Sequence, residues 1–151
     1  MSTTPLEWRE QYDRMLRWQE RVCNHKLIDA HVIDDCHAFF TCCYHLKDWL
    51  RHDGVVTKKA VERYVTRNLW LSLCGDLANG SKHMLVKNPR YNESSRIESL
   101  LVLSTGLGIS LMPVRSKLVV KQGTRTYRIE QVVNSSVTQW QGFLRDHNLI
   151  P

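Results

Sequence analysis

The chain has 151 residues, with 21 lysines and arginines against 15 acidic residues, and a formal net charge of +6. A composition of 42% hydrophobic and 24% charged residues is ordinary for a globular protein and excludes overall disorder. No apolar run approaches the about 18 residues of a membrane span, and no signal peptide is expected. We therefore expect one domain over residues 1–151, located in the cytoplasm and without a membrane partner.

Four helices are expected within residues 1–87, where they form an antiparallel bundle. The first begins with the capping pattern Thr4–Glu7, which puts threonine at the N-cap and proline at the first helical position, and ends near Arg21. The second is expected from His31 to His52. Its apolar residues recur every three or four positions and predict one buried stripe of Val32, Cys36, Phe39, Cys43, Leu46 and Leu50.

The third helix begins after Thr57, a suitable N-cap, and the fourth covers about residues 69–81. The two are either continuous or separated by a kink. Gly80 follows an asparagine and is expected to kink or end the fourth helix. The predicted apolar face of the fourth helix consists of Trp70, Leu73, Cys74, Leu77 and Met84.

A small antiparallel sheet is expected over residues 97–130, after a polar loop at Asn88–Ser95. The β-favouring runs are Ser99–Ser104, Gly108–Met112, Lys117–Lys121 and Thr126–Ile129. Gln122–Arg125 is typical of a hairpin turn. A last helix at residues 131–147 has the apolar stripe Val133, Val137, Trp140 and Leu144. The predicted class is α+β, mainly α.

The cysteines and the charges suggest a reduced protein with a basic second half. The five cysteines are an odd number and no secretory signal is expected, so we expect no disulfides. None of them forms a Cys-x2-Cys pair, so we expect no zinc site, and no cofactor is expected. Residues 1–56 carry a net −2 and residues 57–151 a net +8. The run Arg115–Arg128 holds five basic residues and no acid. Such asymmetry favours a polyanionic partner such as RNA, or is only a solvated basic surface.

Two polar stripes are candidates for chemistry. On the fourth helix the stripe consists of Ser72, Asp76, Asn79 and His83, opposite the apolar face. On the second it consists of His37, Thr41, His45, Asp48 and His52. His45 and Asp48 are three residues apart, so their side chains can meet. If the two helices are neighbours, His45, Asp48, Asp76, Asn79, Lys82 and His83 converge; otherwise the stripes are ordinary solvated faces.

Two segments carry a resemblance to a known family, Phe39–Leu50 (FFTCCYHLKDWL) and Cys74–His83 (CGDLANGSKH). Together with the helical bundle, they resemble proteins of the HEPN type, many of which are metal-independent ribonucleases acting as toxins or in anti-phage defence. The resemblance implies an active site across a homodimer interface. Of the candidate residues, His83 matches the histidine of the family. On this hypothesis His83 is the general acid or base, Asn79 and Lys82 position phosphate, and His45 with Asp48 completes or orients the site.

In the family signature four to six residues separate an arginine from the histidine that follows it, and the corresponding positions before His83, 76–78, hold no arginine. This departure favours a rival hypothesis, a non-catalytic helical module for dimerisation or partner binding. A third hypothesis is a nucleic-acid binder that uses the basic run Arg115–Arg128.

Overall fold

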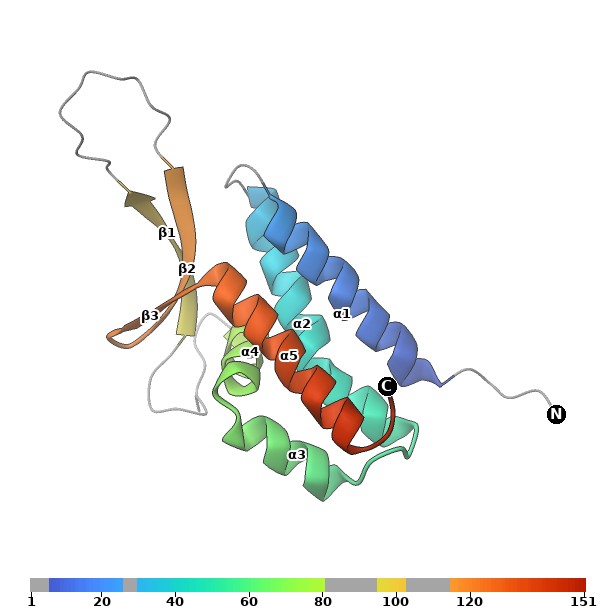
Figure 1. Cartoon of the computed structure of the whole chain (residues 1–151). Coiled ribbons are helices and arrows are strands. Elements are labelled where there is room, and N and C mark those ends of the chain that lie inside the picture. Colours follow the sequence, from blue (N-terminus) through green and yellow to red (C-terminus); the bar gives the residue numbers. More distant parts are fainter. Residues whose placement is uncertain (1–5, 26–29, 81–94, 103–114) are drawn as a thin grey trace, which may run out of the picture.

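The computed structural model describes residues 6–25, 30–80, 95–102 and 115–151 (Figure 1). The described elements are α1 (Glu7–Asn24), α2 (Ala30–His52), α3 (Lys58–Arg67), α4 (Leu69–Gly80), β1 (Ser95–Val102), β2 (Arg115–Gln122), β3 (Arg125–Arg128) and α5 (Ile129–Asp146). Helices dominate, and the strands form one small antiparallel sheet. The predicted α+β, mainly α class is therefore confirmed. No helix in these ranges has the length and apolar character needed to cross a membrane.

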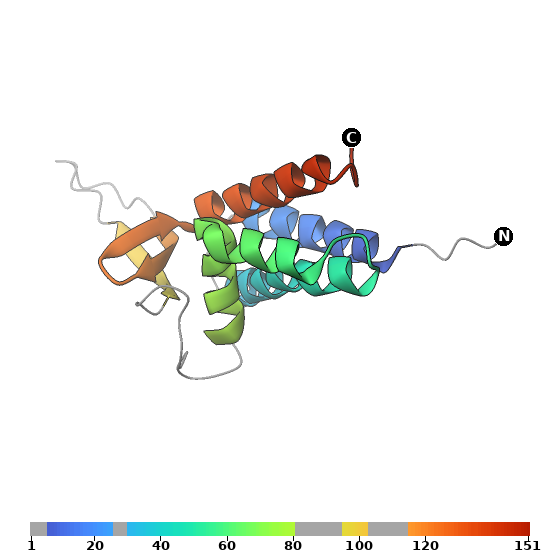
Figure 2. The ribbon, with the colours of Figure 1, turned by 90° about the horizontal axis from the view of Figure 1, so that it is seen from below.

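The helices form one bundle, and the sheet lies at one end of it beside α4 (Figures 1 and 2). α1 and α2 lie antiparallel, and α5 packs against both of them. α4 contacts α2, α3, α5 and β1, and its residues Leu71–Ala78 are all buried. Because protein interiors are close-packed, the side chains of a short helix surrounded in this way must fit against all of its neighbours.

The start of α1 differs from the predicted one. Thr4 lies outside the described residues, and Leu6 is extended, so the helix begins at Glu7 rather than at the proline. The Trp8 backbone N–H donates to Asp53 Oδ2 at 2.7 Å, across 45 residues of sequence. A carboxylate from the α2–α3 turn therefore caps α1, where it also opposes the positive end of the helix dipole.

Asn68 separates α3 from α4, which settles the alternative left open by the sequence. Its Oδ1 accepts hydrogen bonds from the backbone N–H groups of Trp70 and Leu71 at 3.1 and 3.2 Å. Its Nδ2 donates to Gln139 Oε1 on α5 at 2.7 Å. At the other end of α3, the Thr57 hydroxyl accepts from the Ala60 N–H, which confirms the predicted cap. The two helices are thus separate and joined at a capped break.

Replacing Asn68 with alanine removes the α4 cap and the bond to α5. We expect the free energy of unfolding to fall by about 1–2 kcal/mol, the usual cost of losing a helix N-cap. Urea denaturation followed by circular dichroism measures this loss. Gln131→Ala, on an exposed side chain of α5, is the control and should cost clearly less. Equal losses in both variants would contradict a capping role for Asn68.

The sheet has the order β1–β2–β3, with antiparallel neighbours. Gln122 pairs with Arg125 across a two-residue turn, and Gly123 in that turn has φ +56°, so the predicted hairpin is confirmed. β1 begins at Ser95, four residues before the predicted run, and Ile129 belongs to α5 instead of a strand. The predicted run Gly108–Met112 and residues 88–94 of the predicted loop lie outside the described residues.

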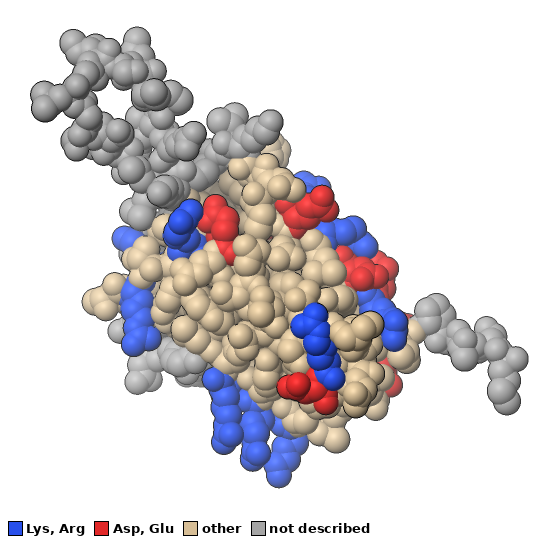
Figure 3. Space-filling model, viewed as in Figure 1, with Lys and Arg blue, Asp and Glu red and all other residues tan. Residues whose placement is uncertain are grey.

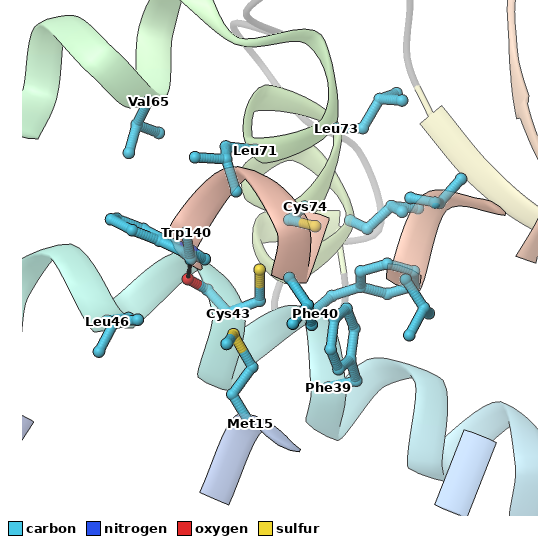
Figure 4. Close-up of a cluster of buried hydrophobic side chains, with 14 of the residues drawn as sticks. Met15, Phe39, Phe40, Cys43, Leu46, Val65, Leu71, Leu73, Cys74 and Trp140 are labelled. Carbon is cyan, nitrogen blue, oxygen red and sulfur yellow. Dashed lines mark hydrogen bonds between the residues drawn. The ribbon is translucent and has the colours of Figure 1, made fainter. Parts of the chain in front are cut away.

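The core is formed by side chains from all five described helices and from β2 (Figure 4). Both stripes predicted on α2 and α5 are buried, with exposed fractions from 0 to 3%. Trp140 lies at the centre, and its Nε1–H donates to the Cys43 carbonyl at 2.9 Å. All five cysteines are free thiols. The periodicity of the apolar residues therefore identified the buried faces of these two helices.

Candidate functional site

The clearest predicted feature on the surface is the pair of His45 and Asp48 on α2. His45 Nδ1 lies 3.1 Å from Asp48 Oδ2, and the side chains are 33% and 35% exposed. An ionised carboxylate only accepts hydrogen bonds, so Nδ1 of His45 must carry the proton. A neutral His45 then has Nε2 available as a base. The predicted meeting of these two side chains is confirmed.

Cations surround the Asp48 carboxylate. Its Oδ1 lies 3.4 Å from Lys47 Nζ and 3.5 Å from an Arg51 guanidinium nitrogen. Lys47 also donates to Glu62 Oε1 on α3 at 2.7 Å. Burial alone would lower the pKa of Lys47, but the hydrogen bond with Glu62 and nearby charges raise it above its ordinary value. Lys47 therefore remains an ammonium beside the pair at neutral pH.

A hollow of about 330 Å³ adjoins this pair at the end of α2. It is lined by Glu7, Asp48, Trp49, Arg51 and His52. Beside it, His52 Nδ1 lies 3.9 Å from Glu7 Oε2 and 3.4 Å from Asp53 Oδ1, a donor set that a divalent cation can use. We assign no ion to it, because Asp53 already caps α1 and the positive end of that helix opposes a cation.

The polar stripe predicted on α4 is not a solvated face. Ser72 is fully buried, and its Oγ donates to the Val65 carbonyl at 2.8 Å, which ties α4 to the end of α3. Asp76 is 1% exposed, and Asn79 is half-buried. Lys82 and His83 lie outside the described residues. The alternative that this stripe is an ordinary solvated face is therefore excluded for Ser72 and Asp76, because α2, α3, α5 and β1 all contact α4.

α2 and α4 are neighbours, as the proposed convergence requires. The Cys43 and Cys74 thiols meet between them. At 100° per residue, His45 and Asp48 lie about 140–160° around α2 from Cys43, and Asp76 lies as far around α4 from Cys74. Those side chains therefore point away from the α2–α4 contact. The structure brings His45 to Asp48, and it places Asp76 on the other side of α4.

Sequence reasoning missed a second charged cluster, in which an arginine and a histidine contact the buried carboxylate of Asp35. Arg21 Nε and a terminal guanidinium nitrogen donate to its two oxygens at 3.1 and 3.0 Å, and His25 Nε2 lies at 2.7 Å. Burial alone would raise the pKa of Asp35, but these hydrogen bonds and charges hold it below its ordinary value. In the sequence, Asp35 lies next to Cys36, a residue of the predicted buried stripe. An acid in that position indicates that a basic side chain pairs with it, but the sequence does not show which one.

Four of the five thiols have a pKa above the ordinary value of a cysteine. Burial raises the pKa of Cys36 to about 12, and it also raises the pKa values of Cys23, Cys42 and Cys43. A nucleophilic cysteine needs a lowered pKa, because only the thiolate reacts. Those four cysteines therefore serve as ordinary side chains.

Comparison with known proteins identified no relative: no family model, no curated protein and no solved structure matches the chain. The fold and the site therefore define only a broad class of protein. It is a helical bundle with a small antiparallel sheet, and its surface carries an oriented His–Asp pair beside a hollow.

Proposed function

We propose that this protein acts on RNA as a metal-independent ribonuclease of the HEPN type, in a toxin or anti-phage defence role in the cytoplasm. The observation that supports this most directly is the His45–Asp48 pair, an accessible imidazole whose tautomer is fixed by a carboxylate. His83, Asn79 and Lys82 belong to the proposed site through the sequence motif. A second copy of the chain would complete it.

The chemistry needs only proton transfers and a place for negative charge. A base takes the proton of the ribose 2′-hydroxyl, the oxygen attacks the adjacent phosphorus, and an acid protonates the departing 5′-oxygen. His83 takes one of these roles, and His45, oriented by Asp48, completes or orients the site. Asn79 and Lys82 position the phosphate. Lys47 and Arg51 add positive charge beside the pair, which favours the charge that develops on phosphate.

The test is cleavage of total RNA by the purified chain in the presence of EDTA. We expect the wild type to cleave, and His83→Ala to lose at least about a hundredfold in rate, as for a general acid or base. His45→Ala should also slow cleavage. His31→Ala, on an exposed histidine at the start of α2, is the matched control and should cleave normally. Circular dichroism must show the same fold in all variants.

Cleavage that persists unchanged in His83→Ala would overturn the assignment. So would a homogeneous wild-type chain that leaves RNA intact at every concentration at which it is folded.

A non-catalytic helical module is the second candidate. It is favoured by the burial of Ser72 and Asp76, because two residues of the predicted catalytic stripe contribute to the interior. In this case the polar face of α2 would bind a second copy of the chain or another partner. Gel filtration that shows a dimer, together with intact RNA in the cleavage assay, would support the module. Cleavage that depends on His83 would exclude it.

A further inference from the structure

The exposed face of α3 carries a cluster of cations without acidic partners. Its members are Lys58, Lys59, Arg63 and Arg67, all of them exposed. Within the described residues, none of the four takes part in an ion pair. The one acid on the helix, Glu62, is held by Lys47 of α2 at 2.7 Å. Figure 3 shows the resulting group of basic side chains projecting from the edge where α3 lies.

The N-terminal half of this cluster is placed against the preference of the helix. Lys58 and Lys59 lie in the first turn of α3, which has no acid. Cations are disfavoured there, because the unsatisfied N–H groups already make that end of the helix positive. Arg67 in the last turn has the opposite, favourable placement. Local preferences are broken most often where a function requires it, so the first turn of α3 suggests an anionic partner.

The spacing of the cluster fits an extended chain of anions. Lys59, Arg63 and Arg67 are four residues apart, so successive side chains rise by about 6 Å along the helix. The opposite face of α3 is fixed in the core by Val61 and Val65. Tyr64, the one aromatic residue of α3, is half-buried and donates to the Gln139 carbonyl. Without an aromatic platform, α3 can contact phosphates but cannot stack on bases.

The cluster adjoins the proposed site. Lys47 contacts Asp48 on one side and Glu62 on the other, so α3 and the His45–Asp48 pair are linked through one buried ammonium group.

We infer that the exposed face of α3, through Lys58, Lys59, Arg63 and Arg67, binds the phosphodiester backbone of a nucleic acid without reading its sequence. This surface is separate from the proposed catalytic residues, and binding does not require cleavage. The predicted basic run Arg115–Arg128 is a different region, on β2 and β3.

The experiment measures binding of the full chain to single-stranded RNA of two unrelated sequences over a range of salt concentrations. The test variant is Lys58→Gln/Lys59→Gln/Arg63→Gln, because glutamine keeps the helix propensity. The matched control is Arg9→Gln/Arg14→Gln/Arg17→Gln on α1, which removes the same charge.

In the test variant we expect the affinity for RNA at low salt to fall at least about tenfold. The slope of the logarithm of the binding constant against the logarithm of the salt concentration should flatten by about 2, because each neutralised phosphate of a single strand contributes ~0.7 to it. The control should bind nearly as the wild type does.

Equal losses in the two triple variants would overturn the inference, because net charge alone would then explain binding. Unchanged binding in the test variant would also overturn it. So would a strong preference for phosphatidylserine vesicles over RNA, which would point to a membrane surface. Normal RNA binding without cleavage would refute the ribonuclease and leave the α3 surface intact, whereas RNA cleavage by a test variant whose RNA binding is unchanged would refute the α3 surface and leave the ribonuclease intact.

Discussion

Replacing Trp140 with alanine is expected to lower the free energy of unfolding by about 3–5 kcal/mol, the usual cost of deleting a large aromatic side chain from a core. Trp140 is fully buried, and its ring lies 5.7 Å from that of Phe143 and 6.4 Å from that of Tyr64. Its indole N–H also satisfies the Cys43 carbonyl on α2. Because a domain of this size is stable by roughly 5–15 kcal/mol, the loss is a large fraction of the total.

Urea denaturation at equilibrium, followed by far-ultraviolet circular dichroism, measures the effect. Trp140→Phe keeps most of the apolar surface but leaves the Cys43 carbonyl without its donor, so we expect it to cost about 1–3 kcal/mol. Thr138→Ala, on an exposed side chain nearby on α5, should stay within about 0.5 kcal/mol. If Trp140→Ala lowered the free energy of unfolding by less than Trp140→Phe does, the role of this side chain in the core would be contradicted.

The parts of the fold that were predictable are those encoded locally. α2 and α5 each have one buried face and one accessible face, so their apolar residues follow the helical period, and their stripes could be predicted from the sequence. Thr57 caps the helix that follows it, and Gly123 provides the positive φ of the turn between β2 and β3. Each of these features depends on residues only a few positions apart.

α4 was predicted less well because its burial is set by its neighbours. A helix covered on one side is amphipathic, whereas α4 is covered by α2, α3, α5 and β1. Its small and polar residues therefore lie in the interior, and the Ser72 hydroxyl donates a hydrogen bond to the Val65 carbonyl near the end of α3. The start of α1 was misplaced for a similar reason, since its cap comes from Asp53, 45 residues away from Trp8. Periodicity contains no information about such partners.

The same distinction applies to the candidate site. The His45–Asp48 contact follows from a spacing of three on one helix, and the sequence predicted it correctly. The bond from Lys47 to Glu62 and the cluster around Asp35 join different helices, so they required the structure. The cations of α3 were visible in the sequence only as part of a general basic excess after residue 56. The structure shows that four of them share one exposed helix without acidic partners among the described residues.

The cluster around Asp35 leads to a second prediction with a large effect. Asp35→Asn is expected to lower the free energy of unfolding at neutral pH by about 2 kcal/mol, the scale of losing hydrogen bonds to a charged group. The side chain of Asp35 is only 7% exposed and joins Arg21 of α1 to its own helix, α2. The expected loss is smaller than that of a fully buried ion pair, because Arg21 is 61% exposed and can regain water.

The dependence of this loss on pH distinguishes stabilisation by the charge of the Asp35 carboxylate from stabilisation by packing alone. Because the pKa of Asp35 is held below its unfolded value of about 3.9, its stabilisation is complete above that value and is lost as pH falls through the folded pKa. The difference in unfolding free energy between wild type and Asp35→Asn should therefore shrink in acid, measured by urea denaturation at a series of pH values. Asp34→Asn, on the exposed neighbouring acid, is the matched control and should change little at any pH. A difference that stays constant into acid would show that the carboxylate's charge contributes nothing, and that Arg21 and His25 act on Asp35 only as packing neighbours.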